Sequence, residues 1–254
     1  MATPDAARKL ADLHDRLVDL SLDDVEETGR IAWQLEGIVR REPKNVVALT
    51  TIAIALAHLG RRDEAVERVR TAFDLRFQVG SLQDGLIGAC SDLGLVEEAR
   101  IVAEEVLATP HGRNDVTAVN NAAITAVLAG DRDFLETLAT IGPTNVQRSC
   151  RNVLSCIDHH GLTDIFGEHM RLIANVVSSH CCDVEVFTDN TGEEPSFAIR
   201  YVLACDFRQT IALRRSLDDS LRQFYARMGR PDLPYVNAIV HILSPLPAMR
   251  ARAA

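Results

Sequence analysis

Apolar side chains in the first two thirds of the chain recur with the period of an amphipathic helix. Before Gly60 they stand at Leu49, Ile52, Ala53 and Leu56, the spacing i, i+3, i+4, i+7 of one helix face. The same spacing follows the glycine, at Ala65, Val69, Ala72 and Phe73. The pattern predicts a helix, a tight turn and a second helix, with glycine in the left-handed conformation that ends the first one.

This unit is repeated along the chain. Leu-Gly-x-x-x-Glu-Ala begins at Leu59 and again at Leu93, 34 residues later. Pro43 and Pro110 each follow an alanine by 11 residues, so a second marker shares the period. Further glycines at Gly130 and Gly161 continue it. We therefore expect residues 8–180 to be almost entirely helical, in antiparallel pairs, with Ala65 and Ala99 buried where the helices meet.

A 34-residue helix–turn–helix period with this motif and a closing proline resembles the tetratricopeptide repeat (TPR) family. The units are residues 8–43, 46–77, 81–110, 115–143 and 145–179, and the second and third match best. The resemblance implies an α-solenoid whose first helices line a concave groove that binds a peptide. It maps these residues onto the groove: Thr50, Ile54, His58, Asp84, Ser91, Asn120, Asn121, Arg148, Arg151 and Ser155.

Two features of that groove suggest how a peptide would be held. An asparagine amide both donates and accepts hydrogen bonds, so Asn120 and Asn121 can hold a peptide backbone. Asparagines following Asp115 are equally consistent with a polar helix start. The chain lacks the lysine-rich clamp that some family members use for a terminal carboxylate, and Arg148 and Arg151 are the substitutes.

The hydrophobic period changes after residue 183. Val184–Thr188 and the alternating segment Ser196–Cys205 predict a hairpin, and Asp206 suits the N-cap of a long helix. Val236–Leu243 is apolar on both faces apart from Asn237 and His241, which predicts a central strand. The predicted fold is thus an α-solenoid of TPR-like helix pairs (1–180) followed by a small α+β unit of ββαβ order (183–254).

One helix covers one face of a three-stranded sheet. The solenoid, a second copy in a homodimer, or another partner must then cover the second face.

Composition and charge narrow the classes of partner. The chain has 254 residues and a net charge of −9, carried entirely by the first 180 residues, so nucleic acid is an unsuitable partner. The longest apolar stretch, Val46–Leu59, is too short to span a bilayer, and Met1–Leu20 has no apolar segment of a signal peptide. We expect a cytoplasmic protein with no membrane partner. Nearly all basic residues are arginine, a composition typical of GC-rich bacterial genomes.

Candidate chemistry is sparse. The six cysteines follow no disulfide or zinc spacing, which favours reduced, buried thiols: Cys90, Cys150, Cys156, Cys181, Cys182 and Cys205. A metal site built from His180-Cys181-Cys182 with His159 and His160 is the alternative. The sequence contains no phosphate-binding loop and no hydrolase or metalloprotease motif. Arg208, Arg215 and Arg222 share one helix face, either as an anion-binding surface or as a solvated one.

These observations predict a non-enzymatic interaction or adaptor protein that binds a protein or peptide, with no cofactor, metal or catalytic residue. The alternative is that the C-terminal unit is a small catalytic or effector domain regulated by the repeats. Its candidate groups are Asp189, Glu193, His241 and an arginine.

Overall fold

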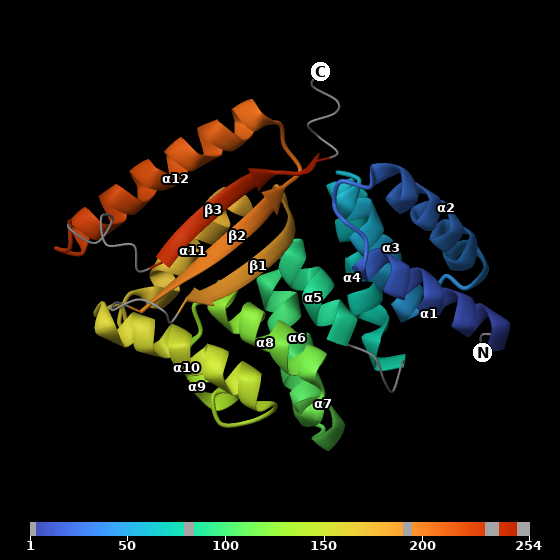
Figure 1. Ribbon diagram of the computed structural model, residues 1–254, viewed down its shortest axis with the longest axis horizontal. Helices are drawn as coiled ribbons and strands as arrows, with labels where there is room; N and C mark the ends of the chain where they lie inside the picture. The colour runs from blue at the N-terminus through green and yellow to red at the C-terminus, as the bar shows by residue number, and fades with distance from the viewer. Residues whose placement is uncertain (1–3, 79–83, 190–194, 232–238, 248–254) are drawn as a thin grey trace.

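The computed structural model describes residues 4–78, 84–189, 195–231 and 239–247 (Figure 1). Helices make up the first part, and a three-stranded mixed sheet with one long helix lies near the C-terminus. The helices of the first part are α1 (Pro4–Val18), α2 (Val25–Arg41), α3 (Val46–His58), α4 (Arg62–Leu75), η1 (Arg76–Gln78), α5 (Asp84–Asp92), α6 (Val96–Leu107), α7 (Pro110–Asn114), α8 (Val116–Ala129), α9 (Arg132–Leu138), α10 (Thr144–His159) and α11 (Phe166–Val177). The C-terminal part comprises β1 (Cys181–Asp189), β2 (Ser196–Leu203), α12 (Phe207–Arg227) and β3 (Ile239–Pro245).

The helix pairs predicted before residue 143 are confirmed within the described residues. Helix α3 packs on α4, α5 on α6, and α8 on α9. Gly60, Gly94, Gly130 and Gly161 all adopt φ between 62° and 72°, and the next residue's amide donates to the carbonyl five positions back, as from Arg61 to Leu56 at 2.9 Å. This left-handed ending satisfies carbonyls that the helix leaves free. Ala65 and Ala99 are fully buried, as predicted, and no strand lies in the described part of residues 44–143.

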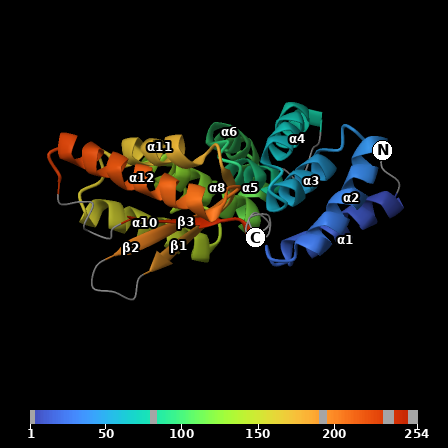
Figure 2. The ribbon, with the colours of Figure 1, turned by 90° about the horizontal axis from the view of Figure 1, so that it is seen from above.

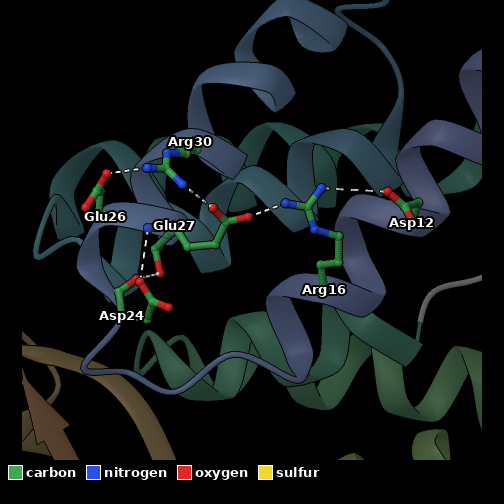
Figure 3. A network of polar contacts seen from close by, with 7 residues as sticks. Asp12, Arg16, Asp24, Glu26, Glu27 and Arg30 are labelled. Atoms are coloured by element: carbon green, nitrogen blue, oxygen red, sulfur yellow. Dashed lines mark hydrogen bonds and ion pairs between the residues drawn. The ribbon is translucent and has the colours of Figure 1, made fainter.

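The first pair, α1 and α2, is joined at the surface by charged side chains (Figure 3). Arg16 of α1 pairs with Glu27 of α2, which also pairs with Arg30 one turn further along. Asp24 caps α2 by accepting a hydrogen bond from the Glu27 amide at 3.2 Å. Because both arginines are solvent-exposed, we attribute the packing of α1 mainly to its buried leucines, Leu10, Leu13 and Leu17.

Helix α11 departs from the repeat pattern. A Cβ on Gly130 would lie 2.6 Å from Cα of Gly167 at the start of α11, and a Cβ on Gly94 would lie 2.7 Å from Cβ of Ser178 just after its end. Helix α11 therefore crosses the turns of two earlier pairs, and its main contacts are with α8 and α12. The prediction that 145–179 forms a fifth helix pair is wrong, although both of its segments are helical.

Arg62, at the start of α4, links the end of α11 to the sheet by hydrogen bonds. Its Nε donates to the carbonyl of Cys181 at 3.0 Å, and its Nη2 donates to the carbonyls of Leu93 and Ser178. One guanidinium thus joins the ends of α5 and α11 and the first residue of β1.

The sheet has the order β1–β2–β3. Strand β1 runs antiparallel to β2, with Val186 opposite Ile199, and β2 runs parallel to β3, with Ile199 opposite His241. Asp206 and Gln209 form a capping box at the start of α12, which confirms the predicted N-cap. The predicted last strand exists from Ile239 onward, but it is an edge strand. Because α12 returns the chain to the free side of β2, β2 is the central strand.

One face of the sheet packs on helices. This packed face carries Val186, Ile199, Tyr201 and Leu243, and α10, α11 and α12 lie against it, while α3 and α5 contact the edge strand β1. Figure 2 shows α11 and α12 on the same side of the strands. The C-terminal unit docks onto the helices through the same face that α12 covers, so the expectation that the repeats cover the second face is wrong. Among the residues that the structure describes, the second face is covered at one end, where Leu22 packs against Val202 and Leu246.

Candidate binding site

A pocket of about 100 Å3 lies where α8, α9 and α10 meet β1. Its buried walls are aliphatic apart from one thiol: Ala123, Val127, Leu135, Cys150 and Val153. Its more exposed lining includes Asn120, Ser149 and Thr188, with Ile124 and Val186 between them. An engineered apolar cavity of about 150 Å3 accommodates benzene, so this pocket has room for one aliphatic side chain. Helical and strand residues build it together.

Asn120 is the predicted groove residue that the structure places at this pocket. It is exposed on the first half of α8. Its amide has both a donor and an acceptor to offer a bound backbone. Ser149 and Thr188 add hydroxyl groups from α10 and β1. The site therefore combines an apolar cavity with polar groups at its opening, the usual composition of a preformed ligand site. Burial raises the pKa of the Cys150 thiol to about 11, so this sulfur is not a nucleophile at neutral pH.

Several predicted groove residues lie between helices instead. Thr50 is 5% exposed, faces Gly85 of α5, and its hydroxyl has no partner among the described residues. His58, on the same helix, is half-buried, and burial lowers its pKa to about 4. Ser91 is buried and shares a 2.9 Å hydrogen bond with Thr125 of α8. Thr50 and Ser91 therefore do not line an open groove, because neighbouring helices enclose them.

Asn120 and Asn121 have different environments although they are adjacent. The Asn121 amide donates to the carbonyl of Asp84 at 3.0 Å and so joins α8 to the first turn of α5. A Cβ on Gly88 would lie 3.1 Å from the same amide, so the two helices are in close contact there. Asp84 itself is half-buried. Asn121 therefore has a structural partner, whereas Asn120 faces the pocket.

Arg148 and Arg151 are exposed, but they lie away from the pocket. At 3.6 residues per turn, both are roughly 140–160° around α10 from Val153, which lines the pocket wall. Arg151 also donates to the side chain of Gln147 at 2.8 Å. A clamp that joins these arginines to Asn120 is therefore not formed, because one helix face cannot carry both sets.

A buried chain of hydrogen bonds joins the C-terminal unit to α11, and the sequence does not indicate it. The Tyr225 hydroxyl lies 2.7 Å from Nδ1 of His169, and Nε2 of His169 lies 2.9 Å from Nε2 of His241. The chain joins α12, α11 and β3. Nδ1 of His241 is buried and has no partner among the described residues. Only His241 stood among the candidate residues, since partners 56 and 72 residues apart in sequence leave no local signal.

Both histidines are held neutral. Burial lowers the pKa of His169 to about 4, and burial together with the neighbouring His169 lowers the pKa of His241 well below its usual value. Because the two Nε2 atoms face each other, one of them carries the hydrogen and the other accepts it. The other proposed catalytic groups do not join this cluster: Glu193 and the side chain of Asp189 lie outside the described residues.

A second buried polar group lies where α5 meets β1. Asp92 accepts a hydrogen bond from the Val184 amide at 3.4 Å. Burial, with Asp183 nearby, raises the pKa of the Asp92 carboxyl well above its usual value, and burial with Glu185 nearby raises that of Asp183.

The proposed cysteine and histidine metal site does not assemble in the described part of the chain. All six cysteines are buried free thiols, and within those described residues no three potential ligands come together. The thiols of Cys181 and Cys182 face different carbonyls, those of Asp183 and His180.

None of the helices within the described residues combines the length and the apolar character needed to cross a membrane. Comparison of the chain with protein-family models, with curated proteins and with solved structures finds no match.

Proposed function

We propose that this chain is a protein- or peptide-binding protein whose binding site is the pocket between α8, α10 and β1. The helix pairs form a TPR-like scaffold in this proposal, and the C-terminal unit completes the site. The observation that supports it is the composition of the pocket, where Asn120, Ser149 and Thr188 surround an aliphatic cavity. The two parts of the chain both contribute residues to it.

Binding would use preformed shape and no reaction. An aliphatic side chain of the partner enters the cavity and is desolvated by Val153 and Val186. Asn120 then donates to, and accepts from, the partner's backbone beside that anchor. An arrangement with one buried anchor and a polar surround concentrates the binding energy in a few contacts.

Selection from a random peptide library displayed on phage, followed by affinity measurements on synthetic peptides, tests the proposal. Ala123→Leu places a larger side chain in the cavity and should weaken binding of the selected peptides at least tenfold. Asn120→Ala should weaken it severalfold. Arg148→Ala, on the far face of α10, is the matched control and should leave the affinity unchanged.

Thermal unfolding of each variant verifies that the fold is retained. Peptides that bind Ala123→Leu as tightly as the unmodified protein would place the binding site elsewhere. A selection that yields no binding peptide would also count against the proposal.

A further inference from the structure

Strand β1 has a free edge beside the pocket. The order β1–β2–β3 leaves β1 paired with another strand on one side only. The Val184 amide donates to Asp92 of α5, so the backbone N–H and C=O of Val184 point away from β2. Because this direction alternates along an antiparallel strand, the N–H and C=O groups of Val186 and Thr188 also point away from β2. Within the described residues, no hydrogen bond reaches these groups.

The first half of the same edge is already occupied. Arg62 of α4 donates to the carbonyl of Cys181 at 3.0 Å, and Asp92 accepts from the next outward-facing amide at 3.4 Å. The free half therefore runs from Val186 to Thr188, and these are the two strand residues that line the pocket. A short stretch of edge and one cavity thus lie side by side.

Unpaired backbone groups on a strand edge define the chemistry of the partner. They are matched by the backbone of a second extended segment, which adds a strand to the sheet. A helix does not match them, because its own N–H and C=O groups are already paired within the helix. In a strand beside Val186 and Thr188, every second side chain points to the face that carries Val186, where the cavity of about 100 Å3 lies. The edge and the cavity therefore select the same conformation.

We propose that this site binds an extended segment of another protein, which pairs with Val186 and Thr188 as an added strand and inserts one aliphatic side chain into the cavity. The inference rests on the proposed function and defines the conformation of its partner. The added strand lies between β1 and α8, so its second edge faces the exposed amide of Asn120. That amide both donates and accepts, as the edge of a strand requires.

A second copy of this chain fits the edge poorly. Figure 1 shows α5 and α8 beyond β1, on the side away from β2, and α5 contacts β1. Joining two β1 edges by a two-fold axis places the helices of both copies on the same side of the joined sheet. Helices α5 and α8 of one copy would then overlap α8 and α10 of the other. A single extended segment needs only about 5 Å beside β1.

The residues that follow β3 start from the wrong end of the edge. Pro245 pairs with Leu203, which also pairs with Cys181, so β3 ends at the same end of the sheet at which β1 begins. Fully extended, residues 248–254 span about 24 Å. Cys181 and Thr188 are themselves roughly 23 Å apart along β1. Residues 248–254 are therefore too few to reach Thr188 and also pair along the free edge.

Peptides that bind at the pocket provide the probe. From the random library, we take those that lose at least tenfold in affinity for the Ala123→Leu variant. Each backbone amide of such a peptide is then N-methylated in turn, which removes one donor and blocks close approach to a strand. We expect losses of at least tenfold at every second residue, where the amide faces β1, and less than about threefold at most residues between them.

Hydrogen exchange of the protein's own amides tests the same contacts. Because the amides of Val186 and Thr188 are unpaired, they should exchange rapidly in the free protein and at least tenfold more slowly in the peptide complex. The Phe187 amide points toward β2 with or without peptide, so it is the matched control and should change less.

Thr188→Pro removes one outward-facing N–H at a position where an edge strand tolerates proline. Thr188→Val removes the hydroxyl but keeps that N–H. The proline variant should therefore lose at least fivefold more affinity for the selected peptides than the valine variant. Should Thr188→Pro fail to fold in a thermal scan, the methylation series and hydrogen exchange decide the question.

Three results would overturn the inference. The first is a methylation series without alternation in peptides that remain sensitive to Ala123→Leu. The second is protection of the Val186 and Thr188 amides in the free protein, because another segment of this chain would then occupy the edge. The third is light scattering that shows a dimer which Thr188→Pro dissociates, because a second copy would then be the occupant. A selection without binders sensitive to Ala123→Leu would instead refute the proposed function, and the inference with it.

Discussion

The helix pairs and the junction between helices and sheet are stabilised in different ways. In the pairs, residues such as Ala65 and Ala99 are buried where helices adjacent in sequence pack together, and the interior is almost wholly aliphatic. At the junction, Arg62 donates to Cys181, 119 residues away, and Tyr225, His169 and His241 form a buried polar chain. Local periodicity specifies the first region, whereas single long-range contacts specify the second.

The largest expected effect tests the close approach of α11 to the helix turns. Gly130→Ala puts a Cβ 2.6 Å from Cα of Gly167 at a residue with φ of 63°. Because backbone must move, we expect a loss of about 3 kcal/mol or more in the free energy of unfolding, measured by urea denaturation.

Gly229→Ala is the matched control. Its φ of 70° is equally left-handed, but no heavy atom lies within 4 Å of the added Cβ. It should cost only the conformational penalty of about 1 kcal/mol. Equal losses for the two variants would show that α11 does not press on the turn.

The second test removes the guanidinium that joins the ends of α5 and α11 to β1. Arg62→Ala leaves the carbonyls of Leu93, Ser178 and Cys181 without that donor. We expect a loss of roughly 2–4 kcal/mol, with faster amide hydrogen exchange in β1. Arg61→Ala, which breaks a largely exposed pair with Glu64, should cost less than about 1 kcal/mol. An Arg62 variant as stable as the Arg61 variant would refute this role.

The third test uses pH. The folded-state pKa of His169 is about 4, against its usual 6.5, and that of His241 is also lowered. As pH falls below about 6.5, His169 and His241 bind protons in the unfolded chain but remain neutral in the folded chain. The free energy of unfolding therefore decreases with falling pH. For His169 the loss is complete near pH 4 and amounts to about 3 kcal/mol.

Buried carboxyls act in the opposite direction. The raised pKa values of Asp92 and Asp183 mean that the folded chain binds their protons first, which adds stability as pH falls. The test therefore compares how steeply the free energy of unfolding changes with pH, between pH 8 and pH 5, in the unmodified protein and its variants. His169→Gln should be less stable at pH 8 but have a flatter profile. His111→Gln, at an exposed position, should retain the original slope. Parallel profiles for all three proteins would contradict the neutral histidine pair.

The smallest effect concerns the helix pairs themselves. Ala99→Leu adds three carbons at a fully buried contact and should cost about 1–3 kcal/mol. Its matched control is Ala108→Leu at the exposed end of α6, where a loss below about 0.5 kcal/mol is expected. Thermal scans that show no difference would mean that close alanine packing does not stabilise the pairs.

The comparison also explains which features could be predicted from the sequence. The glycine turns, the buried alanines, the hairpin and the Asp206 cap depend on neighbouring residues, and the sequence predicts them correctly. The path of α11 depends on Gly167 meeting Gly130, and the edge position of β3 depends on where α12 returns the chain. Neither feature follows from a repeated pattern in the sequence.

The candidate site shows the same limit. Asn120 could be singled out from its place on a first helix. Its neighbours Ser149 and Thr188 could not, because they reach the pocket only when β1 docks beside α8 and α10. The repeat positions of Thr50 and Asn121 predict that both side chains face the groove. Successive residues of a helix point about 100° apart, so a residue next to a groove position faces the neighbouring helix instead.

The central claim is that partners bind at the junction and not along the helix pairs. Nuclear magnetic resonance chemical-shift mapping with a peptide selected from the random library tests it most directly. The account predicts that the largest changes fall on Asn120, Ser149, Val153 and Thr188, and that Ala123→Leu abolishes them. Changes centred on α2–α4, with the junction unaffected, would contradict it.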